Sequence, residues 1–266
     1  MLKRWLWIIV PALLIALLWG YTRTASDWHY VISADAGTLV FAASFDGDAN
    51  ATYNDDWEQY PGRQSAQIIE SAMRINVGAP SSGNYSLAAH RYTDFEAHVR
   101  AQAIEGPENN GYGMIFRLSD RDTYYRFMVS SDGYYSVQRV LNGEIKYLSN
   151  WIITTLDLPE LNGVRVNTGL NAINELAVIA HGDTFEFYIN GVRAPLCIPN
   201  DPAGESTYYE FFATPEERCV QGTMTDTLID SSIAQGQIGV VAQSFDFGET
   251  DRAVVIDFLD MVVYAQ

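Results

Sequence analysis

Side chains of two kinds alternate in the stretch "RDTYYRFMVSSDGYYSVQRV", and this alternation constrains the fold more than any other feature of the sequence. Tyr125 and Phe127 fall on one parity, whereas Tyr124 and Arg126 fall on the other. A period of two describes a β-strand, and Asp132-Gly133 is a dipeptide typical of a tight hairpin. The stretch therefore predicts two antiparallel strands that share an apolar face and a mixed polar-aromatic face.

Short strands and turn residues continue through most of the chain, and no stretch after residue 25 shows sustained helical periodicity. Hairpin dipeptides stand at 132–133, 142–143 and 190–191, and a further turn is expected at 182–183. The pattern predicts strands at 38–45, 67–76, 85–90, 95–104, 113–118, 123–130, 134–140, 144–148, 174–180, 184–189, 236–243 and 253–264. This arrangement indicates one all-β domain over 38–266, either a sandwich or a barrel.

The N-terminal segment differs from the rest, because residues 5–21 carry no charge and form about the shortest run that spans a bilayer as a helix. We expect a transmembrane signal-anchor within residues 1–25 and a polar linker over 26–37. The nearby small-residue pairs suit signal peptidase poorly, which favours an uncleaved anchor; a cleaved signal peptide is the alternative. Lys3 and Arg4 precede the span and only Arg23 closely follows it, so the N-terminus is expected in the cytoplasm and the domain outside.

The exported part is strongly acidic. Three of the 16 Lys and Arg residues precede Ser26 and no acid does, so the remaining 13 face all 33 acids, a net charge of about −20. Phosphate backbones are bound by clustered cations, so this charge argues against nucleic acid as a partner. The carboxylates either bind divalent cations or keep an exported domain soluble.

Cys197 and Cys219 are the only cysteines. They flank a loop-like stretch with three prolines, and in an oxidising compartment we expect them to form a disulfide. Two unpaired thiols are the alternative.

The segment "GYGMIFRLSDRDTYYRFMVSSDGYYSVQRVLNGE" is followed by Trp151, then by "NELAVIAHGDTFEFYINGV" and by the closing "GQIGVVAQSF" and "VVIDFLDMVVY". This order of motifs resembles the concanavalin A-like, laminin-G-like jelly rolls over roughly residues 41–264, and it is most similar to bacterial exported domains grouped with the 3-keto-disaccharide hydrolase family. The resemblance implies a two-sheet antiparallel jelly-roll sandwich at the bacterial cell surface or in the periplasm. In relatives with known ligands, the curved inner sheet often holds sugars.

The mixed face of the 121–140 hairpin would lie in that sheet. Aromatic rings cover the C–H faces of sugars, and neighbouring polar side chains bond the hydroxyls. The parity of the strands nominates as ligand-binding residues Arg117, Tyr124, Arg126, Tyr134 and Gln138, with Trp151 at the edge. For each of them the alternative is an ordinary half-buried strand residue.

No catalytic residue is nominated. Retaining glycosidases place two carboxyl groups about 5 Å apart on one sugar bond, but Asp94 and Glu96 share a strand parity with His98 instead of a third acid. The sequence has no nucleophile elbow, no His-Glu-x-x-His pair and no phosphate-binding glycine loop. These absences favour a domain that is not an enzyme, and they leave open a hydrolase of a 3-keto-disaccharide or a glucan.

A structural Ca²⁺ is the one metal that the sequence suggests. "DGDANATYND" places Asp46 and Asp48 at alternate positions of an oxygen-donor loop, although it lacks the glycine and the final glutamate of an EF-hand. In a jelly roll the first and last strands commonly lie side by side, which would bring Asp257 or Asp260 near Asp46. A solvated acidic turn is the alternative.

Three functions are consistent with these features. The first is a membrane-tethered, non-catalytic domain that binds glycan or cell-envelope polysaccharide. The second is an accessory subunit that packs against other membrane or surface proteins, suggested by the anchor and by "YYEFF" at 208–212, an apolar cluster that would be costly to expose. Hydrolysis of a disaccharide or glucan is the third.

Overall fold

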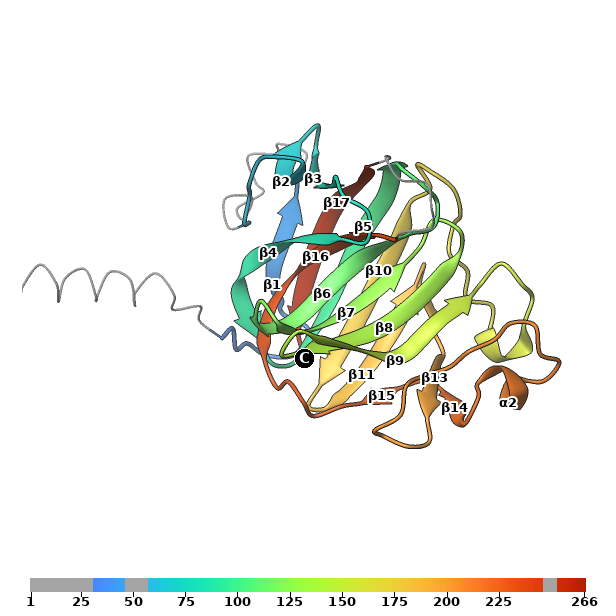
Figure 1. The fold of residues 1–266 in the computed structure, drawn as a ribbon. Coiled ribbons are helices and arrows are strands. Elements are labelled where there is room, and N and C mark those ends of the chain that lie inside the picture. The colour runs from blue at the N-terminus through green and yellow to red at the C-terminus, as the bar shows by residue number, and fades with distance from the viewer. Residues whose placement is uncertain (1–30, 46–56, 246–252) are drawn as a thin grey trace, which may run out of the picture. The chain divides into compact units, whose positions relative to one another are not determined.

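Two antiparallel sheets stack on each other in the computed structural model, which describes residues 31–45, 57–245 and 253–266. The six-stranded sheet lies in front in Figure 1. In sheet order it contains β4 (Gly83–Tyr92), β16 (Gly236–Ser244), β6 (Asn110–Asp120), β7 (Thr123–Val129), β8 (Tyr134–Leu141) and β9 (Glu144–Ile153). The chain from β6 to β9 is a meander of consecutive hairpins, and the turn dipeptides at 132–133 and 142–143 predict the last two of its turns.

The nine-stranded sheet lies behind it (Figure 1). Its order is β12 (Val192–Arg193), β11 (Thr184–Ile189), β10 (Asn174–His181), β5 (Phe95–Glu105), β17 (Val254–Ala265), β3 (Ala72–Val77) and β2 (Gln64–Ile69), while β1 (Leu39–Ser44) pairs with β17 and β15 (Leu228–Ile229) pairs with β11. The all-β, two-sheet sandwich is therefore confirmed. So is the pairing of the first and last strands, in which Ser44 lies opposite Asp260.

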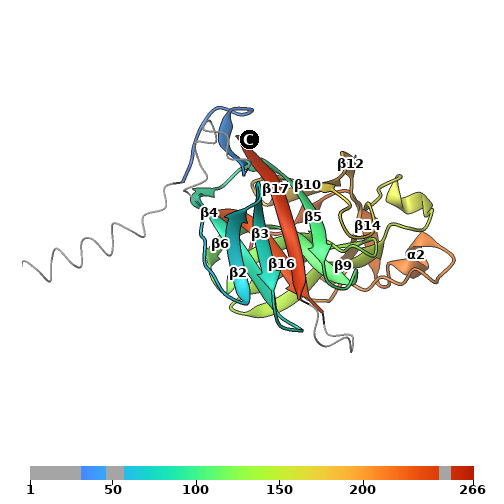
Figure 2. The same cartoon turned by 90° about the horizontal axis from the view of Figure 1, so that it is seen from above.

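A small accessory region covers one end of the sandwich, where both views place β14 and α2 (Figures 1 and 2). It contains the two-stranded sheet of β13 (Leu196–Pro199) and β14 (Gly222–Thr225), the 3-10 turn η2 (Pro159–Leu161) and the single-turn helix α2 (Pro215–Arg218). The expected disulfide is confirmed, because Cys197 and Cys219 are bonded with their Cα atoms 5.5 Å apart.

The prediction of one continuous strand at 67–76 is wrong, because two strands lie there. The chain forms a hairpin there, β2 and β3, that turns at Glu70 and Ser71 with φ of 50° and 65°. Neither residue is a glycine or asparagine, so the sequence carried no turn signal. β9 is also longer than predicted and includes Trp151.

The apolar parity of the hairpin is confirmed. Tyr125, Phe127 and Tyr135 are fully buried between the sheets. Tyr125 packs 5.2 Å from Phe185, and Phe127 packs 5.0 Å from Phe187, measured between ring centroids. Each aromatic ring buried this way removes a large apolar area from water, and this removal is the main stabilising contribution of the sandwich.

No helix in the described part of the chain is long and apolar enough to cross a membrane. The span expected at residues 5–21 lies outside the described residues, so it stays a prediction. Part of the expected linker is described and bonds to the sandwich: the Ile32 amide donates to the Arg91 carbonyl, and the Gly37 amide donates to the Ala265 carbonyl.

Candidate functional site

The six-stranded sheet has a second face, turned away from the nine-stranded sheet, which we call the outer face. A separate apolar cluster lies on it, formed by Leu87, Ile115, Leu118, Met128 and Val241. Tyr85, Tyr124 and Trp151 pack against this cluster and remain partly exposed. Tyr124 and Trp151 therefore lie on the face that parity predicts.

One row of residues crosses the outer face from strand to strand. Ile115 of β6 lies opposite Arg126 of β7, which lies opposite Gln138 of β8, which lies opposite Tyr147 of β9. Arg126 Nε and Nη2 both donate to Gln138 Oε1, at 2.9 and 2.5 Å. Strand parity predicts that Arg126 and Gln138 lie on one face, and in the structure their side chains are in direct contact.

Arg126 and Gln138 are more buried than is usual for polar residues on the solvent-facing side of a strand. Gln138 is 0% exposed and Arg126 is 6% exposed, and Tyr124 and Tyr147 lie close to Arg126. Burial lowers the pKa of Arg126, with Tyr124 and Tyr147 close enough to oppose this shift. The outer face thus combines partly exposed aromatic rings with a buried polar pair.

A hollow of about 360 Å³ opens at one end of the outer face. Its aromatic lining comes from Tyr134 of β8, Tyr147 and Trp151 of β9, and Phe245 just after β16. Trp151 and Phe245 meet edge to face, with centroids 5.6 Å apart. The volume is at the lower end of the range for small-molecule sites, which suits one or two sugar rings.

Polar groups line the rest of this hollow. Asn109, Asn110, Ser130 and Asp132 come from the start of β6 and from the β7–β8 turn. The Asn110 side chain is itself fixed, since its Nδ2 donates to the Pro107 carbonyl at 2.8 Å. Burial raises the pKa of Asp132, partly opposed by the hydrogen bond from Ser130. Amide and carboxylate groups beside aromatic rings can bond the hydroxyls of a sugar.

Arg117 is the nominated residue that the structure does not bring to the outer face, so the parity prediction is wrong for it. The pairing of β6 with β7 is irregular between Phe116 and Asp120, and Arg117 has φ of 49°, which inverts the alternation. Its guanidinium donates to three backbone carbonyls, and it lies 4.6 Å from the Phe185 ring centroid.

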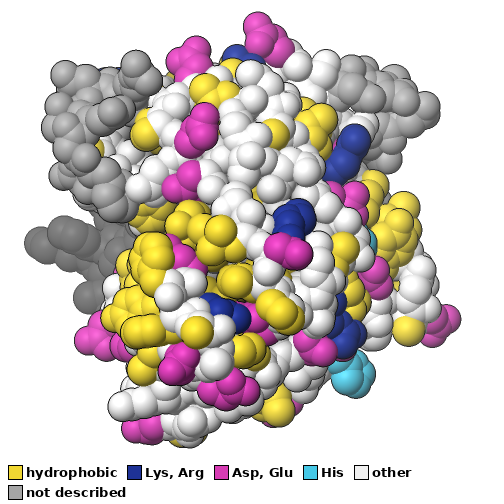
Figure 3. Space-filling view, turned by 90° about the vertical axis from the view of Figure 1, so that its right-hand side faces the viewer, with side chains coloured by type: hydrophobic (Ala, Val, Ile, Leu, Met, Phe, Trp, Pro, Cys, Tyr) yellow, Lys and Arg dark blue, Asp and Glu magenta, His cyan; other side chains and the backbone are white. Residues whose placement is uncertain are grey.

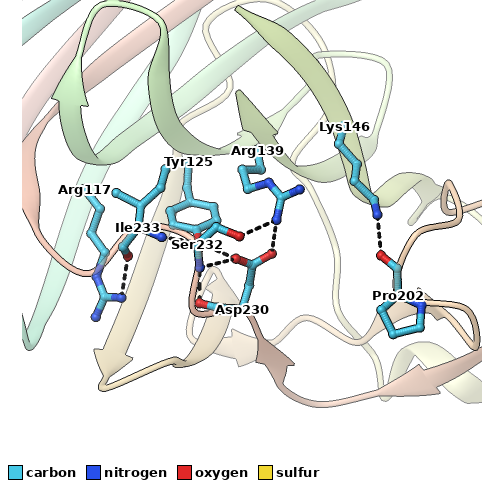
Figure 4. A network of polar contacts seen from close by, with 8 residues as sticks. All are labelled: Arg117, Tyr125, Arg139, Lys146, Pro202, Asp230, Ser232 and Ile233. Carbon is cyan, nitrogen blue, oxygen red and sulfur yellow. Dashed lines mark hydrogen bonds and ion pairs between the residues drawn. The ribbon is translucent and has the colours of Figure 1, made fainter. Parts of the chain in front are cut away.

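Arg117 and its neighbours hold the 230–233 loop onto the sandwich, as Figure 4 shows. Tyr125 Oη donates to Asp230 Oδ1 at 2.6 Å, and Arg139 Nη1 donates to Asp230 Oδ2 at 2.7 Å. Arg117 Nη1 donates to the Ile233 carbonyl at 3.0 Å. These contacts are structural, and none involves the outer face.

Several lining residues were missed by the sequence reasoning. Tyr147 shares its parity with Trp151, and Phe245 shares its parity with Val241, so strand alternation was a signal for both. Asn109 and Asp132 lie in turns, where no periodicity exists to place them.

The calcium ligands expected from the sequence are only partly described. Asp46 and Asp48 lie outside the described residues. Both carboxylate oxygens of Asp257 accept from Arg74, at 2.7 and 2.8 Å, so this carboxylate already has a cationic partner. Within the described ranges, no group of three His, Cys, Asp or Glu side chains could hold a metal ion.

A second hollow, of about 300 Å³, lies over β5, β10 and β11 of the nine-stranded sheet. His98 lies between two glutamates there, with Nε2 2.9 Å from Glu96 and Nδ1 3.3 Å from Glu175. Tyr188 is the aromatic ring that lines it. This hollow is a competing place for a small ligand, and another of about 370 Å³ is lined by Tyr60, Tyr85 and Arg121 among others.

The sequence matches no protein-family model and no curated protein. Solved structures share its fold at low identity. A GH43 protein of Bacillus licheniformis, BlXynB, has a TM-score of 0.51 and 13% identity over 85% of this chain, which spans 39% of that protein. A carbohydrate binding module, CBM66 of Bacillus subtilis, has a TM-score of 0.46 and 12% identity, with 90% of this chain and 100% of that one covered.

A Bacillus subtilis protein with a galectin-like fold has a TM-score of 0.49 and 10% identity, with 87% of this chain and 99% of that one covered. At such identities the likeness to BlXynB shows a common sandwich fold and carries no ligand or activity with it. The narrower resemblance to the 3-keto-disaccharide hydrolase family stays a prediction.

Proposed function

We propose that this chain is a membrane-tethered, extracytoplasmic domain that binds glycan, without cleaving it, in the hollow on the outer face. The observation that carries this proposal is the lining of that hollow, where Tyr134, Tyr147, Trp151 and Phe245 surround a space of about 360 Å³ beside amide and carboxylate groups. Flat rings of this kind stack on the C–H faces of sugars, and the polar groups select among hydroxyls.

The hollow has a single carboxylate in its described lining, which favours binding without cleavage. Asp132 is the only acid among the described residues that line it. Hydrolysis with two carboxylates needs a pair about 5 Å apart, or somewhat further with an intervening water. Hydrolysis of a 3-keto-disaccharide or a glucan is retained as an alternative, tested by release of reducing sugar.

A glycan array followed by calorimetry tests the proposal. Trp151→Ala and Tyr134→Ala are each expected to weaken binding by about five- to thirtyfold, since stacking of one aromatic ring contributes on the order of 1–2 kcal/mol. Tyr264→Ala, on the opposite sheet, is the matched control and should leave binding unchanged. An array without a single binder, or binding lost only in the control, would remove the proposal.

Tethering is tested separately by membrane fractionation of cells that express the 266-residue chain. Recovery in the membrane fraction that resists salt and carbonate supports the anchor expected at residues 5–21. Release by either wash contradicts it.

A second function, that of an accessory subunit that packs against another protein, is favoured by exposed aromatic side chains in the accessory region. These are Tyr209, Phe211 and Phe212. These side chains are 49%, 89% and 47% exposed, whereas Tyr208 folds back and bonds to Glu160. Figure 3 shows hydrophobic side chains gathered on the side of the molecule where α2 lies, among scattered acids. Packing against another protein would bury this group. Detergent extraction followed by sizing tests it, and a lone monomer is the contrary result.

A further inference from the structure

Three arginines of the described chain are buried, Arg117, Arg126 and Arg218, and among them only Arg126 has no carboxylate within ion-pair distance. Arg74, Arg139 and Arg218 each bond to a carboxylate. Arg117 donates to three backbone carbonyls and also lies 3.8 Å from the Asp94 carboxylate. The only acceptor that bonds to Arg126 is the neutral amide oxygen of Gln138.

Such an arrangement is unfavourable by itself. Arg126 is only 6% exposed as a residue, so its guanidinium loses much of its hydration. One neutral acceptor replaces little of that hydration. Burial accordingly lowers the pKa of Arg126. The chain has 33 acids but places none of those in its described part within ion-pair distance of this group.

The surroundings of Arg126 indicate where a partner would come from. Nε and Nη2 are occupied by Gln138, while Nη1 has no bonded acceptor in the described part of the chain. Tyr124 and Tyr147 lie close to the guanidinium, and Tyr147 also lines the hollow proposed to bind glycan. The charge therefore lies in the row of residues that leads to the hollow.

We propose that Arg126 is the anion subsite of the outer face and that the bound glycan carries a carboxylate, as a hexuronate unit does. This inference rests on the proposed glycan binding and adds the class of sugar. A planar carboxylate matches the guanidinium geometry, and a charge-assisted hydrogen bond is about twice as strong as a neutral one. The carboxylate of the ligand would then be the negative charge that pairs with the Arg126 guanidinium.

The charge of the whole chain limits what kind of acidic glycan fits. The formal net charge of −17 repels a polyuronate along its length, whereas Arg126 can pair with only one of its carboxylates. A glycan with a single, isolated acidic unit meets Arg126 at short range, while the remaining charges are screened beyond about 8 Å at physiological salt. We therefore expect single uronates to bind better than polyuronates.

The experiment compares pairs of disaccharides that differ only at C6, glucose against glucuronate and galactose against galacturonate, by calorimetry with the 266-residue chain. The acidic member of one pair should bind at least about tenfold more tightly than its neutral partner. Gln138→Glu should abolish this preference without lowering thermal stability, because it gives Arg126 an internal carboxylate. Gln67→Glu, an exposed change of equal charge on the nine-stranded sheet, should preserve it.

The outcomes separate this inference from the function on which it rests. Neutral sugars that bind as well as their acidic partners overturn the anion subsite and leave glycan binding intact. The anion subsite is also overturned if the preference for the acidic disaccharide persists in both Gln138→Glu and Arg126→Gln. Tighter binding of polygalacturonate than of the single uronate contradicts the argument from net charge. Failure of every sugar to bind removes both proposals.

Discussion

At the scale of single residues, two buried arginines show how differently the fold treats the same charge. Arg218 has a complete set of partners: Glu160 accepts from Nε and, at 2.9 Å, from Nη2, and the Phe212 carbonyl accepts from Nη1. Arg126 has one neutral partner. A buried arginine with all its hydrogen-bond and charge partners is compatible with a stable native state. A buried arginine that lacks partners lowers the free energy of unfolding, and a ligand that supplies the missing partner raises it again.

Glu160→Gln should destabilise the domain by about 2 kcal/mol, because it leaves the 5% exposed Arg218 without its counter-charge. Burial raises the pKa of Glu160, but the hydrogen bonds from Arg218 outweigh it and hold this pKa below its ordinary value. The ion pair therefore stabilises fully above about pH 4.3 and loses its effect as pH falls through the lowered pKa. Thermal melts at pH 7 and pH 3 should show a large difference from wild type at pH 7 and a smaller one at pH 3.

Asp132→Asn is expected to have opposite effects on stability and binding. Burial raises the pKa of Asp132, so its carboxylate costs stability at neutral pH, a cost that disappears as pH falls through the raised pKa. The amide should leave the melting temperature unchanged or raise it by a few degrees, while glycan affinity falls several-fold. A loss of stability with unchanged affinity would show that Asp132 is only a turn residue.

At the scale of elements, the accessory region depends on its crosslink. The disulfide joins the start of β13 to the end of α2, across 22 residues of sequence that contain little regular structure. Glu160 of η2 then fastens α2 to the segment that follows β9. Covalent and ionic contacts therefore hold the region together, in addition to the burial of Leu161, Leu196 and Tyr208 in the main core.

Replacing both Cys197 and Cys219 by serine should lower stability by about 3 kcal/mol on the chain-entropy estimate, or roughly 6–12 °C in melting temperature for a domain of this size. Calorimetry of the variant, and of wild type with reductant, measures this. Since β7, β8 and the main core lie outside the loop, binding at Trp151 should survive at a temperature where both proteins are folded. Unchanged melting would mean that the loop is already restricted without the crosslink.

At the scale of the whole molecule, net charge selects the class of partner. With 33 acids against 16 bases, the chain should not bind duplex DNA or vesicles rich in anionic lipid at physiological salt. Mobility-shift and vesicle-flotation assays check this. Tight binding to either that weakens with salt would reveal a basic patch that the described surface does not suggest.

The sequence by itself determined an all-β domain of antiparallel hairpins, because strand alternation and turn dipeptides act locally: Tyr125 against Tyr124, and the turns at 132–133 and 142–143, need no distant information. These local patterns left a sandwich or a barrel open, and the resemblance favoured the sandwich. It also placed Tyr124, Arg126 and Gln138 on one face. Only the tertiary structure decided that an irregular pairing turns Arg117 away, that Tyr134 meets Phe245 around one hollow, and that Arg126 is buried without an anion. Those facts depend on contacts between strands far apart in the chain, and a period-two pattern contains no distances between them.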